Sequence, residues 1–363
     1  MCAMPSDKER TAALLEEIRE LVPGEIRLME VCGTHTMSIA ASGIKTMLPP
    51  EIGLLSGPGC PVCVTPPQVI DAVLELSMEK DVILTSYGDM LRVPGSRRGD
   101  SLLRRKALGA RVETVYSPVD AVELALQNPE KQVVFLGVGF ETTAPGTAAA
   151  VLTAKEKGAK NFTLWSMLKR VEPALRALIR MDGFNVDGFL CPGHVATIIG
   201  ADGFAFLPVE YGLPAVVAGF EPKDILRAIY RLVKQLAEKS PRLENEYTRA
   251  VSQKGNILAQ RILKQCFEPR FDLWRGLGGI ESSGLGLRDE LKGFDAEKRF
   301  DIRYSDTETP TACRCGEVIT GRRSPAQCPL FGKACTPEDP VGPCMVSSEG
   351  ACAAAWKYAS LPL

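Results

Sequence analysis

Cysteine is the residue type in this chain that is best suited to chemistry, and it is unevenly distributed. The 363 residues include twelve cysteines and two histidines. Six cysteines follow residue 312, whereas the others are Cys2, Cys32, Cys60, Cys63, Cys191 and Cys266. Thiolates are nucleophiles and soft metal ligands, so this many cysteines predicts thiol chemistry or metal binding rather than packing alone.

The first candidate is Cys32, which stands between an expected strand and an expected helix in Cys32-Gly-Thr-His35. Backbone N–H groups at a helix start, together with the helix dipole, stabilise a thiolate. His35 lies one helical turn further on and could act as a base or as a second ligand. The alternative is a half-buried cysteine beside a capping histidine, with no chemical role.

The second candidate is the pair Cys60-Pro-Val-Cys63, on a Gly/Pro-rich turn that follows an expected strand at Ile52–Leu55. A Cys-x-x-Cys pair at the start of a helix has a lowered thiol pKa and forms a disulfide reversibly. The same pair could bind a metal. Two purely structural thiols are the alternative, although chance seldom places both on such a turn.

Polar side chains follow three more expected strands. They are Asp89, Glu141 with Thr142, and Cys191 with His194. Ligands bind at the carboxyl ends of strands in open parallel sheets, so we expect these side chains to line one cleft with Cys32 and Cys60. The glycines before Glu141 do not complete a dinucleotide-binding fingerprint, which requires Gly at Thr142. A structural Cys/His pair is the alternative for Cys191 and His194.

The C-terminal cysteines form a separate group of possible ligands: Cys313, Cys315, Cys328, Cys335, Cys344 and Cys352. Four thiolates can hold zinc or an iron–sulfur cluster. Wide, uneven spacing with prolines nearby favours a cubane cluster on Cys313, Cys328, Cys335 and Cys352, without excluding zinc. Cys315 or Cys344 could replace a neighbour in this set. A disulfide framework is disfavoured if the protein is cytoplasmic.

The elements that must position these residues recur at a regular interval. Short apolar runs follow one another about every 30 residues, the length of a strand with its crossover helix. This spacing predicts an α/β protein with two similar parallel-sheet domains facing a central cleft, followed by a C-terminal domain whose cysteines could hold an iron–sulfur cluster. The expected ranges are 1–22 for an N-terminal helix that could pack on the C-terminal domain, 23–122 and 123–240 for the α/β domains, and 241–363 for the last domain.

The expected last domain starts with helical patterns and ends in a Cys-rich segment. A helix is predicted from Pro222 to Lys239 and another from Glu244 to Phe267, with a Gly-rich loop at 274–294. Residues 308–345 are rich in Cys, Pro and Gly and can bury little on their own. A metal cluster is one way to hold such a segment together.

Charge and hydropathy narrow the possible partners. The chain has 43 Lys and Arg against 44 Asp and Glu, a net charge of −1. This balance argues against general binding to nucleic acid or to anionic membranes, which needs a basic surplus. No apolar run is long enough to span a membrane, and the N-terminus lacks a signal-peptide core. We therefore expect a cytoplasmic protein with reduced thiols.

Taken together, these segments resemble the HypD family of hydrogenase maturation proteins along essentially the whole chain. The resemblance rests on residues 30–36, 57–63, 139–145 and the Cys313–Cys352 region, which includes Cys344-Met-Val-Ser-Ser-Glu-Gly350. It implies a redox-active scaffold that holds iron, with a small partner, HypC, while the Fe(CN)2CO group of [NiFe]-hydrogenases is assembled. Cyanide would arrive from a second partner, HypE.

The resemblance also implies roles for individual residues. Cys32 would be the main iron-binding thiol and His35 a supporting group, with Cys60 and Cys63 as a redox-active pair near the Fe(II) that carries CN and CO. Cys313, Cys328, Cys335 and Cys352 would ligate a [4Fe-4S] cluster. No standard catalytic class follows from these roles.

Two other classes of protein would explain part of the sequence. An iron–sulfur-dependent thiol–disulfide oxidoreductase that acts on protein disulfides would account for the Cys-x-x-Cys and the cluster, but not for the Cys32 segment. A structural zinc-binding interaction protein would account only for the C-terminal cysteines.

Overall fold

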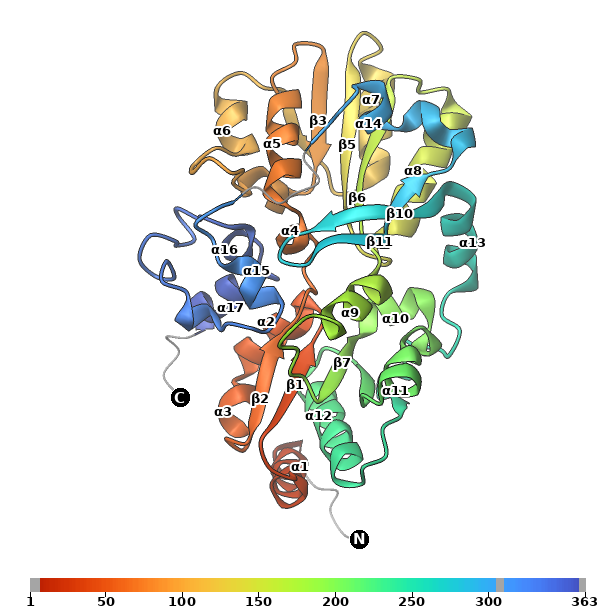
Figure 1. Ribbon diagram of the computed structural model, residues 1–363. Coiled ribbons are helices and arrows are strands. Elements are labelled where there is room, and N and C mark those ends of the chain that lie inside the picture. Colours follow the sequence, from red (N-terminus) through yellow and green to blue (C-terminus); the bar gives the residue numbers. More distant parts are fainter. Residues whose placement is uncertain (1–6, 305–309, 359–363) are drawn as a thin grey trace.

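Two parallel β-sheets dominate the computed structural model, which describes residues 7–304 and 310–358 (Figure 1). The first sheet has the order β2-β1-β7-β8-β9, with β1 Ile26–Glu30, β2 Ile52–Ser56, β7 Gly188–Pro192, β8 Ala215–Ala218 and β9 Leu243–Asn245. The second has the order β4-β3-β5-β6, with β3 Val82–Ser86, β4 Val112–Thr114, β5 Gln132–Gly139 and β6 Phe162–Leu168. The predicted α/β class with two parallel sheets is confirmed.

The strands of the first sheet are not consecutive in the sequence, because the four strands of the second sheet come between β2 and β7. The prediction of two successive units divided near residue 122 is therefore wrong. The chain leaves the first sheet after β2, builds all of the second sheet, and returns to the first with β7. The return strand pairs with β1, with Leu28 opposite Gly188. A Cβ at Gly188 would lie 3.3 Å from the Leu28 side chain, so a small residue suits this pairing. The spacing of the strands indicates that strand–helix units are present, but it does not indicate which strands pair with each other.

Helices cover the first sheet, and the N-terminal helix is among them. They are α1 Asp7–Leu21, α2 Gly33–Ser42, α3 Ile44–Met47, α10 Gly193–Ile199, 3-10 helix η2 Ala201–Phe204, α11 Phe206–Tyr211 and α12 Pro222–Ala237. Ile18 of α1 is buried in one apolar cluster with Ile229 and Leu232 of α12. Helix α1 therefore packs on α12 and not on the C-terminal region, because the apolar stripes of these two helices match.

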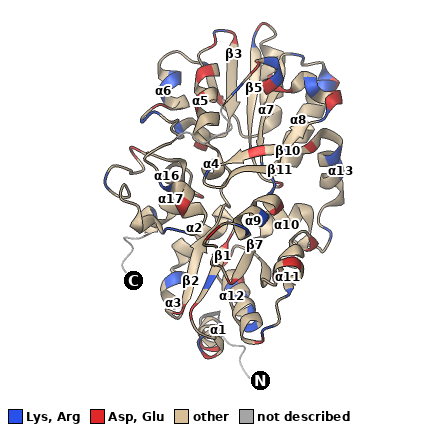
Figure 2. Cartoon of the chain, in the orientation of Figure 1, with Lys and Arg blue, Asp and Glu red and all other residues tan. Residues whose placement is uncertain are grey.

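The second sheet and its surroundings hold the remaining helices of the α/β part. They are α4 Pro61–Val64, α5 Pro67–Leu76, η1 Gly88–Arg92, α6 Leu102–Ala107, α7 Pro118–Gln127, α8 Ala144–Lys157 and α13 Ile257–Cys266. Helix α9 Val171–Ile179 lies by the first sheet, where Arg176 pairs with Glu210 of α11 (Figure 1). None of the helices in the described ranges is both long and apolar enough to cross a membrane. Basic and acidic residues are interspersed over the outer helices (Figure 2), in keeping with the net charge.

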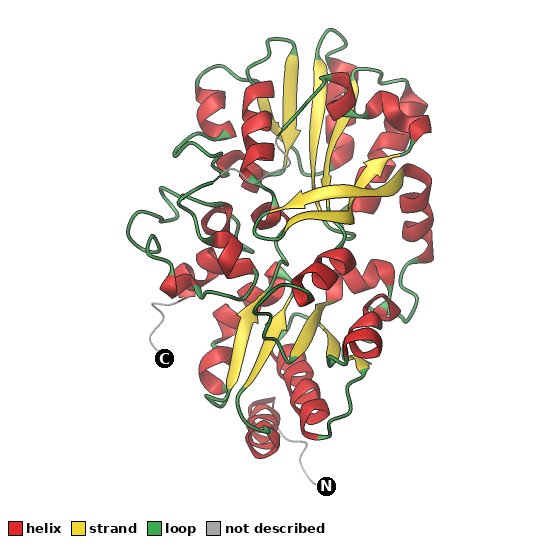
Figure 3. Cartoon of the chain, in the orientation of Figure 1, coloured by secondary structure: helices red, strands yellow, loops and turns green. Residues whose placement is uncertain are grey.

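An antiparallel hairpin replaces the Gly-rich loop that the sequence predicts at 274–294. Its strands are β10 Phe267–Trp274 and β11 Gly278–Leu287, and it lies between the two sheets (Figure 3). The expected helix at 244–267 is also wrong. Its first residues belong to β9, and α13 begins only after the N-cap Asn256, whose side chain accepts from Ala259 N at 3.0 Å. Gly284 sits where a Cβ would lie 2.7 Å from Asp272 Oδ2, so glycine here serves strand packing and does not mark a loop.

The C-terminal segment has little regular structure and lies beside α2 and α4 (Figure 1). Its elements are α15 Cys315–Ile319, η4 Pro325–Gln327, α16 Pro343–Val346 and α17 Ala351–Tyr358. The preceding η3 Asp289–Phe294 and α14 Ala296–Arg299 pack instead on β6 of the second sheet. Helix α17 packs on α2, while α15 and α16 pack on α4. The range 241–363 is therefore not one unit, because β9 belongs to the first sheet and the hairpin lies between the sheets.

Candidate thiol and metal site

Cys32 is the N-cap of α2, at the carboxyl end of β1, and only 8% of it is exposed. Burial raises the pKa of its thiol to about 12, and the charges of Glu349 and Glu30 add to the effect. Backbone N–H groups of His35 and Thr34 act in the opposite direction. The expected helix-start geometry is therefore present, but burial and two carboxylates outweigh it. A cation beside Cys32 would reverse this balance and hold a thiolate.

Carboxylates from distant parts of the chain surround Cys32. Glu30 Oε2 accepts from Cys32 N at 3.1 Å, and burial raises the pKa of Glu30 to about 7. Glu349 Oε1 accepts from Thr34 Oγ1 at 3.0 Å. Asp89 Oδ2 accepts from Ser347 Oγ at 3.0 Å. The pKa of Glu349 is raised mainly by burial and to a smaller extent by the charge of Asp89. These carboxylates lie near Cys32, but no three of the described Cys, His, Asp and Glu side chains are close enough together to hold a single metal ion.

Glycines allow three chain segments to meet at Cys32. A Cβ at Gly59 would overlap the backbone of Cys32, and a Cβ at Gly33 would overlap Glu349. Gly33 N donates to Gly59 O at 3.1 Å. The loop that precedes Cys60 is thus held directly against the Cys32 backbone.

The Cys60–Cys63 pair forms a disulfide, with Cα atoms 5.2 Å apart. Cys60 is the N-cap of α4, and its sulfur accepts from Cys63 N at 3.2 Å. Both residues are buried, at 4% and 0% exposure. The expected turn at the end of β2 therefore brings two thiols within bonding distance, beside Cys32.

The two histidines, His35 of α2 and His194 of α10, both pack against Phe220. His35 Nε2 donates to Gly219 O at 2.9 Å, and its ring centroid is 4.8 Å from that of Phe220. The His194 ring stacks on the Phe220 ring, with the two ring centroids 3.9 Å apart. Burial lowers the pKa of His35 to about 4, so the ring is neutral. The described contacts of the His35 ring are with Gly219 and Phe220 and not with the Cys32 thiol.

The other expected cleft residues have no described contact with the Cys32 thiol. Cys191 lies inside β7 in the core, and burial raises the pKa of its thiol. Glu141 Oε1 accepts from Val171 N at 2.9 Å, and burial raises the pKa of Glu141 to about 7. Thr142 is half-buried in the turn before α8. These residues hold the backbone in place or fill the core, and none of their described contacts is with Cys32.

All six C-terminal cysteines line one cavity, together with apolar side chains such as Val318, Leu330 and Met345. Hydrogen bonds between thiols link Cys313 to Cys315, Cys315 to Cys344, and Cys344 to Cys352. Within the described ranges, no three Cys, His, Asp or Glu side chains converge closely enough to hold a single metal ion. A lining of thiols without carboxylates is compatible with an iron–sulfur cluster and with zinc, since both can be held by four thiolates.

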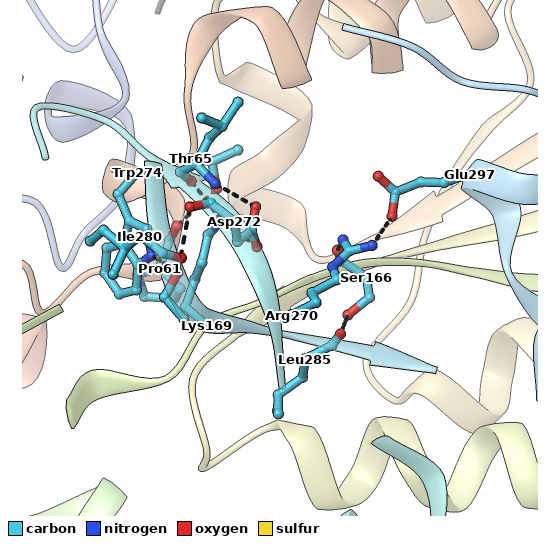
Figure 4. A network of polar contacts seen from close by, with 12 residues as sticks. Pro61, Thr65, Ser166, Lys169, Arg270, Asp272, Trp274, Ile280, Leu285 and Glu297 are labelled. Atoms are coloured by element: carbon cyan, nitrogen blue, oxygen red, sulfur yellow. Dashed lines mark hydrogen bonds and ion pairs between the residues drawn. The ribbon is translucent and has the colours of Figure 1, made fainter. Parts of the chain in front are cut away.

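The cysteine cavity touches the disulfide. Cys315 Sγ lies 3.9 Å from Cys63 O and donates to it. The hairpin holds the same loop from another side, because Arg275 N donates to Val64 O at 2.8 Å. A buried ion pair of Lys169 with Asp272, 2.7 Å apart, anchors this hairpin to the end of β6 (Figure 4).

Sequence reasoning missed three residues of this site: Glu30, Glu349 and Arg275. Glu349 lies between Cys344 and Cys352, and an acidic residue among predicted ligands is a signal that could have been used. Arg275 follows Trp274 in a segment that the sequence predicts as loop. Of the unassigned cysteines, Cys266 is a buried packing residue with Sγ 3.7 Å from Ala148 O, and Cys2 lies outside the described residues.

Known proteins are similar to this chain over nearly its whole length. A family model described as "HypD: Hydrogenase formation hypA family" matches residues 9–359. The chain is 44% identical over 361 residues to "Hydrogenase maturation factor HypD2" of Bradyrhizobium diazoefficiens, covering 97% of this chain and 95% of that protein. It is 43% identical over 358 residues to "Hydrogenase maturation factor HypD" of Escherichia coli, covering 96% and 95%.

The similarity places the chain among hydrogenase maturation factors. Within that class, it belongs to the HypD family, as its motifs predict.

Proposed function

We propose that this protein is a redox-active scaffold that holds Fe(II) at Cys32 while the Fe(CN)2CO group of a [NiFe]-hydrogenase is assembled. The observation that carries the proposal is the buried Cys32 thiol, enclosed by Glu30 and Glu349 and held against the loop of the Cys60–Cys63 disulfide. The iron is cargo. A cation at this point would offset the carboxylate charges and stabilise the Cys32 thiolate.

The C-terminal cavity is the proposed place of a resident [4Fe-4S] cluster, on Cys313, Cys328, Cys335 and Cys352. The thiol donors that line this cavity support this cofactor. Cys315 and Cys344 line the same cavity, so either could replace one of the four proposed ligands. When bound, such a cluster would supply electrons one at a time.

The Cys60–Cys63 pair would store two electrons beside the iron. An external electron donor and two protons would convert the disulfide to a dithiol. A thiocyanate on the HypE partner then needs two electrons and one proton to break its S–C bond, which leaves a thiol on HypE and cyanide on the iron. The dithiol supplies these two electrons and returns to the disulfide; one of its two protons goes to the HypE thiol and the other to solvent.

The proposed partners are HypC, in a stable complex, and HypE, transiently. The near-neutral net charge supports protein partners and gives no basis for nucleic acid or a membrane surface. Reduced cluster ligands would suit a cytoplasmic location.

An iron–sulfur-dependent reductase of protein disulfides is the second candidate, because Cys315 contacts the disulfide loop. Mössbauer and infrared spectra of anaerobic protein with HypC distinguish the two functions. A low-spin iron signal with CN and CO bands, lost in Cys32→Ala, supports the scaffold. A four-iron cluster alone, with turnover of protein disulfides, supports the reductase and contradicts the scaffold.

A further inference from the structure

Arg275 is a buried cation at the turn of the β10–β11 hairpin, and only 3% of it is exposed. Its backbone N–H donates to Val64 O at 2.8 Å, and its Nε donates to Thr65 O at 3.1 Å. Val64 and Thr65 directly follow Cys63. Arg275 therefore holds the last turn of the short helix that carries the disulfide.

The other side of Arg275 faces the C-terminal cysteines. It lines a cavity with Cys313, and its charge favours the thiolate forms of Cys313 and Cys315. The hairpin turn packs tightly there, because a Cβ at Gly276 would lie 2.5 Å from Gly316 Cα. One residue thus contacts the disulfide helix and approaches two cysteines of the proposed cluster site.

The Arg275 guanidinium is not neutralised by a carboxylate within the described ranges. No ion pair there includes Arg275, and its Nη2 is buried without a hydrogen-bond partner. A buried cation without a partner is costly to fold, so a negative group nearby is the expected compensation. Glu317 lines the same cavity but pairs with Arg314 and Arg323, which leaves thiolates such as Cys313 as candidates, because they are negative when they bind metal.

We propose that Arg275 is a positioning residue that raises the reduction potential of the cluster and fixes the Cys60–Cys63 helix against it. The proposal rests on the proposed function, because it needs a cluster in the cysteine cavity. Reduction adds one negative charge to the cluster, and a buried cation next to its ligands stabilises that charge more than an exposed cation does.

The test is a redox titration of the cluster in the full-length, cluster-loaded protein, followed by electron paramagnetic resonance. Arg275→Gln and Arg275→Met remove the charge, and Arg275→Lys keeps it. We expect both neutral variants to shift the potential downward, by about tenfold in the reduction equilibrium, or about 59 mV for one electron. The Lys variant should retain most of the wild-type potential.

Arg314→Gln is the matched control. Arg314 lines the same cavity, but its side chain is 52% exposed and pairs with Glu317 at 3.5 Å. Water and salt screen such a charge, so this variant should leave the potential nearly unchanged.

Two results would overturn the role of Arg275. One is an unchanged potential in a neutral variant with a full cluster, and the other is loss of the cluster from both neutral variants, which would make Arg275 a purely structural residue. Both results leave the proposed function standing. A wild-type protein that binds no four-iron cluster would instead contradict the cluster itself, and the role of Arg275 with it.

Discussion

The thiol of Cys315 donates to the carbonyl oxygen of Cys63 at 3.9 Å, which joins two cysteine motifs that are 252 residues apart in the chain. Cys63 is half of the disulfide beside Cys32, and Cys315 lines the six-cysteine cavity. Through this contact, an electron carrier in the cavity would lie next to a two-electron store.

Cys328→Ala should remove the proposed cluster. Anaerobically prepared wild-type protein should hold about four irons with matching sulfide, and the variant should lose them, because three thiolates hold a cubane poorly. Iron and sulfide analysis measures this. Cys266→Ala is the control, since Cys266 packs between α13 and α8, and it should keep the full content. Unchanged iron in Cys328→Ala would refute the ligand set, and Cys344→Ala would then be the next variant to analyse.

Cys60→Ala should lower the number of electrons that the protein accepts by about two, because it removes one disulfide and leaves the cluster in place. Coulometric titration of wild type and variant, at equal cluster content, counts these electrons. If both proteins accept the same number, the Cys60–Cys63 pair is not the electron store.

Gly59→Ala should destabilise the protein by about 1–3 kcal/mol and weaken iron retention at Cys32, because its Cβ would overlap the Cys32 backbone. Chemical denaturation gives the free energy of unfolding, and iron analysis with HypC gives retention. Gly146→Ala, in α8, is the matched control, since nothing lies within 4 Å of its Cβ. It should leave stability unchanged or raise it by up to about 1 kcal/mol. Equal effects of the two substitutions would argue against the close approach.

Glu141 should make the free energy of unfolding depend on pH. Burial raises its pKa from 4.5 to about 7, so the folded protein binds this proton more tightly than the unfolded chain does. The stabilisation that comes from this bound proton is fully present below pH 4.5 and is lost as the pH rises to about 7. The free energy of unfolding should fall by roughly 3 kcal/mol over this range.

Glu141→Gln keeps the shape and the acceptor for Val171 N but does not titrate. Denaturation curves between pH 5 and pH 8 should therefore slope less in this variant than in wild type. The remaining slope should include Glu30, whose pKa is also raised to about 7. Parallel curves for the two proteins would show that Glu141 is already ionised when buried.

Local sequence was sufficient for the features that depend on neighbouring residues. The α/β class follows from the regular alternation of strands and helices. Cys32 closely follows a short apolar run, and Cys60 follows one after a Gly/Pro turn, so both stand near strand ends. The Gly/Pro turn likewise places Cys60 and Cys63 one helical turn apart, close enough for a disulfide. The hairpin was missed because its glycines provide space for Asp272 and Arg270, a need that only the opposite strand creates.

Only the tertiary structure decided what surrounds these residues. The pairing of β1 with β7 returns the chain to the first sheet, and packing of α17 on α2 brings Glu349 to Thr34, 315 residues away. Packing of α15 on α4 likewise brings Cys315 to Cys63, and the hairpin brings Arg275 to Val64. Such contacts depend on matching shapes of distant surfaces, which no local pattern encodes, whereas the cysteines and their spacing can be read along the chain.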